Sequence, residues 1–357
     1  MTDQPAGRFE VDPELKGIWK KYGEPKFFFP RVEDMAGSRR LHAMGNTRFM
    51  KSAFVKETLG NTSPPPWTEE DRPIVVRDGS SIKVRIYRPR ENSTGRPVMV
   101  VAHSGGWCLG GLETEEFICQ LLCLRLNMVV VNVAYRLSPD VSYPTHVFDV
   151  YDTIKWVAVN AQSIGGELSK GFLTCGVSAG GNLTNMCSIL ARDEGLRPNL
   201  TGHVYICTGF PHDYRDQNGN ISQLFPEQFQ SPSGSWEMYK DGPVANRAMN
   251  GFYADLAKCD ASSPLFSPFT QKDFSGLGPV YFQVAGMDLW KDTSPFYCDL
   301  IEQAGGRTKI DVYPGVPHLW YSIYPQLSIN KKWARDLVDG VEWLLKQKSE
   351  AQISSRL

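Results

Sequence analysis

The chain has 357 residues, with 38 basic and 39 acidic side chains and a net charge of -1. Hydrophobic residues make up 41% and charged residues 22% of it, as in soluble globular proteins. This balance, without a basic block, does not favour nucleic acid or a charged membrane surface as a partner. No apolar run approaches the ~18 residues of a transmembrane helix, and the first residues lack a signal peptide's apolar core. Neither stable membrane insertion nor secretion is expected.

The eight cysteines are scattered through the chain without a CxxC pair. Most of them lie in apolar runs, which favours buried free thiols over disulfides or a metal site. We therefore expect an intracellular protein, located in the cytoplasm by default, that binds no metal.

The N-terminal part of the chain mixes charged and aromatic residues. A helical period covers residues 13–23, and the segment "FFFPRVEDM" is broken at Pro30. Residues 61–73 read as a linker, because consecutive prolines neither continue a helix nor pair in a sheet. In residues 74–89, β-branched residues alternate with others on both sides of Asp78-Gly79, which predicts a β-hairpin.

Apolar strands then alternate with helical patterns. The predicted strands cover residues 97–103, 128–135, 171–177, 202–209, 279–286 and 309–315, and the predicted helices cover residues 114–126, 147–161 and 330–347. Near-continuous apolar strands separated by helices indicate a mostly parallel sheet with helices on both faces, the α/β class. Residues 211–263 break the alternation, being irregular and rich in glycine, proline and aromatics. So long a segment favours a lid or binding wall, with a plain surface insertion as the alternative.

The stretch "GVSAGGN" follows the strand at 171–177 and places a serine, Ser178, between glycines. A serine nucleophile needs a base, a carboxylate that orients the base, and N–H donors for the oxyanion. In a parallel sheet these groups gather at the carboxyl ends of strands. Ser178 is therefore the candidate nucleophile, and the N–H of Ala179, at the start of a helix, is a candidate oxyanion donor.

Three other loops that follow strands supply the remaining groups. His103 ends one strand and precedes Gly105 and Gly106, whose N–H groups can approach a substrate oxygen closely. Asp288 follows the strand at 279–286 and is the candidate acid; a helix N-cap is its alternative role, and Asp292 is the competing acid. His318 follows the strand at 309–315 and is the candidate base. His146 and His203, inside helix- or strand-like runs, are expected to be packed.

The order Ser178, Asp288, His318 is the order of α/β-hydrolases. From about residue 70 to 350 the chain resembles the hormone-sensitive-lipase group of α/β-hydrolase esterases. The matching motifs are "HSGGW", "YRLSPD", "YPTHVFD", "GVSAGGNL", "SPLFSPF", "AGMDLWKD" and "YPGVPHLW". The resemblance implies an α/β-hydrolase fold and a serine esterase with His103 orienting the oxyanion loop. Val177, Leu289 and Leu319-Trp320 depart from the usual family residues.

The resemblance also implies a domain plan. Residues 1–65 and 211–263 are expected to form a cap over a catalytic core of residues 66–210 and 264–357. The expected pocket residues are Trp107, Phe210, His212, Leu319 and Trp320. A small-molecule ester is the expected partner and no cofactor is expected, while the oligomeric state is left open, a homodimer included.

Two rival functions share these residues. An acyltransferase, lyase or cyclase of a natural-product pathway could use the same triad with water excluded by the cap. A ligand-binding receptor is the second rival; gibberellin receptors resemble this family but have lost the base, whereas His318 is present here.

The tripeptide Ser355-Arg356-Leu357 is similar to the peroxisomal Ser-Lys-Leu signal, so peroxisomal import is the alternative to the cytoplasm.

Overall fold

The computed structural model describes residues 9–25, 29–91, 95–210, 234–260 and 262–354. One eight-stranded sheet runs through it in the order β1-β2-β4-β3-β5-β6-β7-β8. The strands are β1 (Trp67–Val75), β2 (Ser81–Pro89), β3 (Val98–Ala102), β4 (Val129–Ala134), β5 (Phe172–Val177), β6 (Gly202–Ile206), β7 (Val280–Ala285) and β8 (Thr308–Tyr313). β1 and β2 pair antiparallel with their neighbours, and the strands from β4 to β8 are parallel. The α/β-hydrolase prediction is confirmed.

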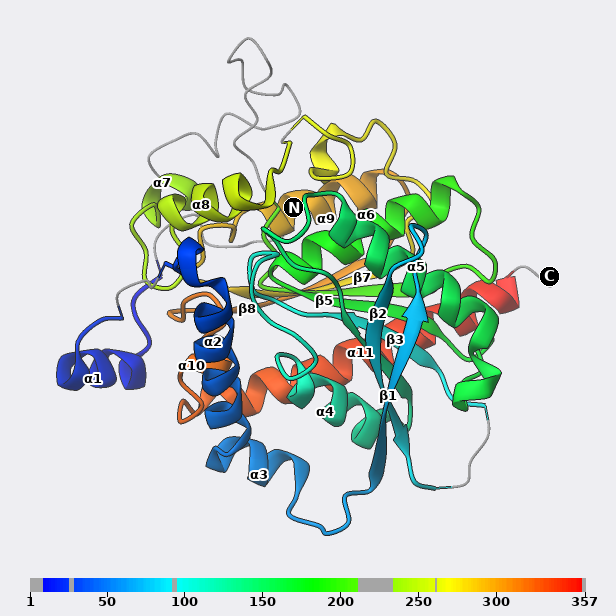
Figure 1. Ribbon diagram of the computed structural model, residues 1–357, viewed down its shortest axis with the longest axis horizontal. Helices are drawn as coiled ribbons and strands as arrows, with labels where there is room; N and C mark the ends of the chain where they lie inside the picture. Colours follow the sequence, from blue (N-terminus) through cyan, green and yellow to red (C-terminus); the bar gives the residue numbers. More distant parts are fainter. Residues whose placement is uncertain (1–8, 26–28, 92–94, 211–233, 261, 355–357) are drawn as a thin grey trace.

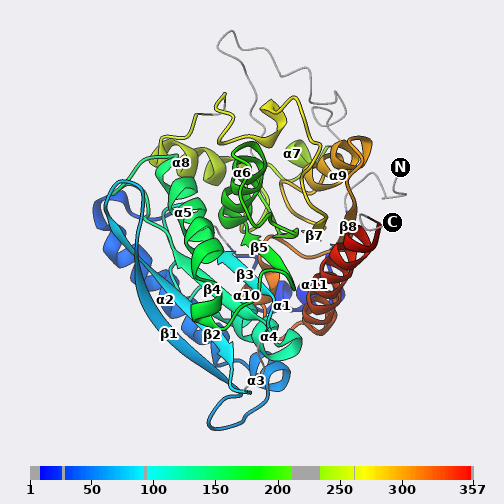
Figure 2. The same cartoon turned by 90° about the vertical axis from the view of Figure 1, so that its right-hand side faces the viewer.

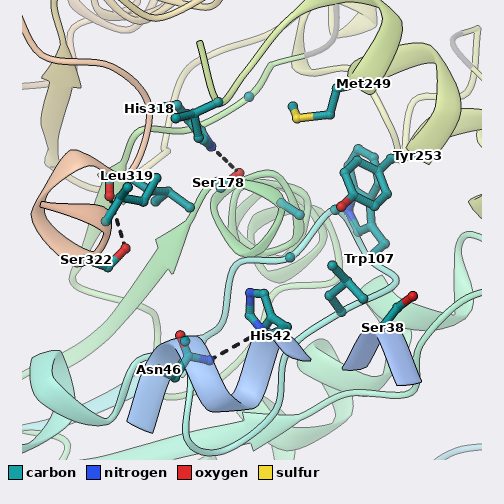
Figure 3. A pocket seen from close by; sticks show the side chains of 18 of the residues that line it. Ser38, His42, Asn46, Trp107, Ser178, Met249, Tyr253, His318, Leu319 and Ser322 are labelled. Carbon is teal, nitrogen blue, oxygen red and sulfur yellow. Dashed lines mark hydrogen bonds between the residues drawn. The ribbon is translucent and has the colours of Figure 1, made fainter. Parts of the chain in front are cut away.

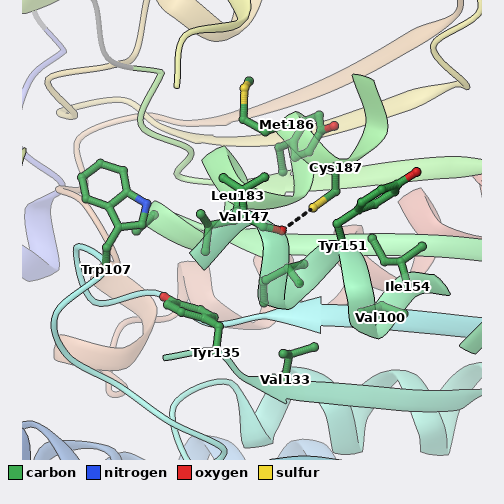
Figure 4. Packing of buried hydrophobic residues seen from close by; sticks show 14 of the residues in the cluster. Val100, Trp107, Val133, Tyr135, Val147, Tyr151, Ile154, Leu183, Met186 and Cys187 are labelled. Atoms are coloured by element: carbon green, nitrogen blue, oxygen red, sulfur yellow. Dashed lines mark hydrogen bonds between the residues drawn. The ribbon is translucent and has the colours of Figure 1, made fainter. Parts of the chain in front are cut away.

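Helices cover both faces of the sheet (Figure 1). One face carries α5 (Thr145–Asn160), α6 (Ala179–Asp193) and α9 (Thr293–Gln303), and the other carries α3 (Ala53–Leu59), α4 (Glu116–Leu126) and α11 (Ile329–Ser354). Each face has its own core. Figure 4 shows the first of them, where Val100 and Val133 of the sheet pack beneath Val147 and Leu183 of the helices. None of the described helices is long and apolar enough to cross a bilayer.

The remaining helices lie at one end of the sheet. α1 (Pro13–Tyr22) and α2 (Met35–Met50) come from the N-terminal segment, and α7 (Ser235–Met238) and α8 (Arg247–Ala257) come from the predicted irregular region. In Figure 1, α2, α8 and α10 (Trp320–Ile323) all lie at this end of the sheet. Figure 2 shows that α2 lies on the side of β1 and away from β8, which lies beside α11. The described part of the chain also has short 3₁₀ turns at Val32–Asp34, Gln162–Ile164 and Pro268–Thr270.

Two local predictions need correction. The predicted linker at 61–73 includes most of β1, because Pro73 lies in an edge strand, where one missing N–H donor is tolerated. The region predicted to be irregular contains α8, whose first turn is capped by the Asn246 side chain accepting from the Met249 N–H over 2.8 Å. The weak helix formers Asn250 and Gly251 obscure this helix in the sequence.

Candidate active site

Ser178 lies on a sharp turn between β5 and α6. Its backbone has φ +52° and ψ −118°, a conformation that residues other than glycine rarely adopt. The flanking glycines leave no room for a side chain: a Cβ on Gly176 would lie 2.3 Å from the Gly180 oxygen, and a Cβ on Gly180 would lie 2.1 Å from the Ala102 oxygen. The turn therefore requires both glycines, and it raises the serine hydroxyl above the end of the sheet.

His318 lies between Ser178 and Asp288. Its Nε2 is 2.8 Å from the Ser178 Oγ, and its Nδ1 is 2.6 Å from an Asp288 carboxylate oxygen. A carboxylate only accepts, so Nδ1–H donates to Asp288 and Nε2 is left to accept the serine proton. His318 and Asp288 are 3% and 2% exposed, so bulk water does not compete for these bonds. The structure brings together three residues that follow three different strands.

The competing acid has other partners. Asp292 accepts from the Ser235 N–H over 2.7 Å and from the Lys291 ammonium over 2.5 Å, immediately before α9.

The two histidines that were expected to be packed are buried: His146 in α5 bonds Ser138, and His203 in β6 bonds Thr174. Neither contacts the Ser178 hydroxyl.

The loop after β3 carries the candidate oxyanion donors. Gly105 and Gly106 have φ of +122° and +59°, and a Cβ would lie 2.2 Å from the Leu109 oxygen or 2.6 Å from the Tyr253 ring, respectively. Within the described parts of the chain, the N–H groups of Gly105, Gly106 and Ala179 donate to no protein acceptor. The arrangement leaves three N–H groups available beside the serine, which is what an oxyanion site needs.

His103 lies beneath this loop. It is fully buried, its ring is stacked on Tyr135 at 4.1 Å, and its Nδ1 bonds the Ser104 carbonyl over 2.7 Å. Burial lowers the pKa of His103 to about 4, so the ring is neutral near pH 7 and its Nδ1–H can donate to that carbonyl. These contacts agree with a role in orienting the loop.

A cavity of about 530 Å³ opens above Ser178 (Figure 3). Its floor is formed by Ser178, Ala179, His318 and the glycine loop. One wall is α2 and the opposite wall is α8, which contributes Met249 and Tyr253. The N-terminal segment and the insertion between the two parts of the core therefore both line the cavity over the candidate nucleophile.

The expected pocket residues divide into two groups. Trp107 and Leu319 line the cavity. Phe210 and Trp320 do not: Phe210 packs against Phe282 and Tyr297, and Trp320 packs against Trp333 on the other side of the sheet. Both are fully buried because aromatic rings of the two cores surround them. His212 lies outside the described residues.

The cavity is also lined by residues of α2 that were not predicted from the sequence. These are Ser38, Leu41, His42, Gly45, Asn46 and Arg48. The helix begins with the Asp34 side chain accepting from the Gly37 N–H over 2.8 Å, a recognisable cap. Its inner face is partly polar because it borders a cavity, so the apolar period that identifies a packed helix is weak.

One group of described residues has the spacing of metal ligands. Donor atoms of Cys207, Asp288 and His318 lie within 4.8 Å of one another. Burial raises the pKa of the Cys207 thiol, which keeps it neutral, and Asp288 and His318 already bond each other. The cluster therefore fits a hydrogen-bonded acid–base pair better than a metal centre.

Comparison with known proteins identifies the family of the chain. Residues 99–322 match the model of a family described as having the alpha/beta hydrolase fold. The chain belongs to this family, and its hormone-sensitive-lipase-like resemblance is confirmed.

Three individual proteins are similar over almost the whole chain. Versiconal hemiacetal acetate esterase of Dothistroma septosporum is 32% identical, covering 90% of this chain and 96% of that protein. Carboxylesterase NlhH of Mycobacterium tuberculosis is 30% identical, covering 89% and 91%. The crystal structure of vibralactone cyclase superposes with a TM-score of 0.84 and 28% identity, covering 98% of each chain.

Proposed function

We propose that the catalytic residues of this carboxylic ester hydrolase are Ser178, His318 and Asp288. The observation that carries the proposal is the unbroken hydrogen-bond chain from the Ser178 hydroxyl through His318 to Asp288. His318 takes the proton as the serine oxygen attacks the ester carbonyl, and Asp288 stabilises the imidazolium that forms. The ester enters as a small molecule, and no step in this sequence calls for a metal or an organic cofactor.

The second part of the proposal concerns the oxyanion. The N–H groups of Gly105, Gly106 and Ala179 would stabilise the negative oxygen of the tetrahedral intermediate, each contributing about 3 kcal/mol in the transition state. His318 then protonates the leaving alcohol, and a water molecule activated by the same histidine releases the acyl group from Ser178. Two chemically simple steps thereby replace one difficult hydrolysis.

The cavity supports esters of small to medium size. Its volume of about 530 Å³ suits a compact ligand, and much of its lining is apolar, including Leu109, Trp107, Met249 and Leu319. The name of the Dothistroma relative denotes an acetate ester, which also supports a short acyl group. We propose that residues 1–65 and 211–263 act as the cap, a role that α2 and α8 support by their position over the cavity.

Two experiments test this function. Initial rates on p-nitrophenyl esters from acetate to palmitate should peak at short or medium chains, and the Ser178→Ala variant should be inactive on all of them; a peak at palmitate would contradict the size assignment. An organophosphonate probe should label Ser178. A serine that stays unlabelled would favour the ligand-binding receptor instead.

A cyclase or acyltransferase remains the second candidate because vibralactone cyclase has a similar structure. Such an enzyme would pass the acyl group from Ser178 to a hydroxyl of the same or another molecule instead of to water. Incubation with an ester and a series of alcohols, with free acid and transferred ester both counted, separates the two. Mostly free acid is expected.

Location and assembly are separate questions. The tripeptide Ser355-Arg356-Leu357 lies outside the described residues. Fused to a fluorescent reporter, it should leave the reporter diffuse if the protein is cytoplasmic and should direct it to puncta if peroxisomal import operates. Light scattering of the purified protein would distinguish a monomer from a homodimer.

A further inference from the structure

The α2 wall of the cavity carries a polar stripe in otherwise largely apolar surroundings. Ser38, His42 and Asn46 are four residues apart along the helix, so they lie on one face, and all three line the cavity. Gly45 lies beside them, and no atom lies within 4 Å of the position its Cβ would take. Figure 3 shows His42 and Asn46 on this wall, below Ser178 and across from Met249 of α8. The stripe is therefore open to a ligand around His42, Gly45 and Asn46, whereas Ser38 is buried and its hydroxyl oxygen accepts from the Arg31 N–H.

The neighbours of His42 define which of its nitrogens carries the proton. The Asn46 side-chain amide donates to His42 Nδ1 over 3.3 Å, and it also donates over 3.3 Å to Thr114 Oγ1 on the loop that follows β3. Thr114 in turn accepts from the Gly111 N–H over 3.0 Å. Because Nδ1 accepts, the proton of a neutral imidazole lies on Nε2.

Two further observations show that Nε2–H is a donor with no partner among the described residues. Burial lowers the pKa of His42, so the ring is neutral near pH 7. In the described part of the chain His42 has a single hydrogen bond, the one from Asn46. A donor without an acceptor next to apolar surface is unfavourable unless water or a ligand atom supplies that acceptor.

We infer that His42 is a specificity-determining residue whose Nε2–H donates a hydrogen bond to a second oxygen atom of the substrate, separate from the scissile ester. The oxygen would belong to a carbonyl, hydroxyl or ether on the arm that extends towards α2. A purely apolar arm leaves the donor unpaired, and sites that bond a substrate oxygen discriminate strongly against analogues that lack it. This inference rests on the proposed ester hydrolysis at Ser178 and names the class of ester.

Matched ester pairs test it on both arms. For the acyl arm the pair is p-nitrophenyl hexanoate and p-nitrophenyl 5-oxohexanoate; for the alcohol arm it is hexyl acetate and 5-oxohexyl acetate, followed by pH-stat. The native protein should favour the oxygenated member of one pair by tenfold or more in kcat/KM. His42→Leu should reduce that preference at least tenfold, and His42→Gln, which keeps an N–H donor, should restore part of it. Met44→Ala is the matched control, because Met44 lies on the exposed face of α2 and is 64% exposed. It should change kcat/KM for neither member of a pair.

The outcomes separate this inference from the proposed function. If the native protein hydrolyses none of the four esters, the hydrolase assignment at Ser178 fails and His42 has no substrate oxygen to select. If it hydrolyses both members of each pair equally, or if His42→Leu keeps the preference, the role of His42 is overturned while hydrolysis stands. If His42→Leu lowers kcat/KM equally for both members of a pair while its thermal unfolding is unchanged, the specificity role is also overturned. His42 would then contribute to the reaction that all esters share.

Discussion

The Glu115 carboxylate accepts a hydrogen bond from the Ser104 backbone N–H over 3.1 Å. Glu115 immediately precedes α4, and Ser104 lies next to Gly105 in the loop of candidate oxyanion donors. Both residues are buried, being 3% exposed each. The loop is thus held from below by one buried carboxyl group, and burial raises the pKa of that group to about 7.

This carboxyl group should make stability depend on pH. The folded protein binds the Glu115 proton more tightly than the unfolded chain does, so its stabilising contribution is full below pH 4.5 and is lost as the pH rises towards 7. At about 1.4 kcal/mol per pKa unit the loss reaches about 3 kcal/mol. The free energy of unfolding of Glu115→Gln, relative to the native protein, should therefore rise between pH 4.5 and 8.

Urea unfolding at pH 4.5, 6 and 8 measures this difference. Glu113→Gln removes an exposed carboxylate two residues away and serves as the control. Parallel stability curves for the native protein and Glu115→Gln would show that the buried group does not titrate in this range.

The two candidate acids can be compared directly. Asp288→Asn should lower kcat about 10⁴-fold, the order found for the corresponding change in a serine protease, because an amide no longer fixes the histidine tautomer. Asp292→Asn should change kcat less than tenfold, because Asp292 bonds Ser235 and Lys291 rather than His318. Steady-state kinetics on one short-chain ester suffices, and equal losses in both variants would contradict the assignment.

A methyl group on the oxyanion loop should also reduce the rate. Gly106→Ala introduces a Cβ that would lie 2.6 Å from the Tyr253 ring at a φ of +59°, so the loop or the ring must shift and the aligned N–H of residue 106 is disturbed. Loss of one aligned donor lowers kcat about 10²- to 10³-fold. Gly251→Ala on α8 meets no atom within 4 Å and is the control; it should keep the rate and add up to about 1 kcal/mol of stability.

Leu319 and Trp320 are neighbours with different expected effects. Trp320→Ala should reduce the free energy of unfolding by about 3–5 kcal/mol, because it empties a fully buried site. Leu319→Ala should enlarge the cavity and shift the p-nitrophenyl ester preference towards longer acyl chains. Thermal unfolding measures the first effect, and the chain-length profile of ester hydrolysis measures the second. A Trp320→Ala variant that keeps its stability would contradict the assignment of Trp320 to the core.

Much of the architecture was predictable because its signals are local. Each parallel strand is a short apolar run between turns, and each candidate triad residue directly follows such a run, so the sheet's own geometry brings Ser178, Asp288 and His318 together. The glycines at 176 and 180 mark the sharp turn for the same reason: a Cβ at either position would collide with neighbouring atoms.

The walls of the cavity were decided only by tertiary structure. α2 borders a cavity rather than a core, so its inner face has no clear apolar period, and nothing in the sequence joins His42 to a serine 136 residues later. Phe210 and Trp320 look like pocket residues from their positions, yet packing turns both into the core. The sequence by itself determined the succession of strands and helices along the chain and the reactive groups that follow the strands, because those depend on local pattern and backbone sterics. Which side chains face the ester depends on how distant segments meet, and only the folded chain decides that.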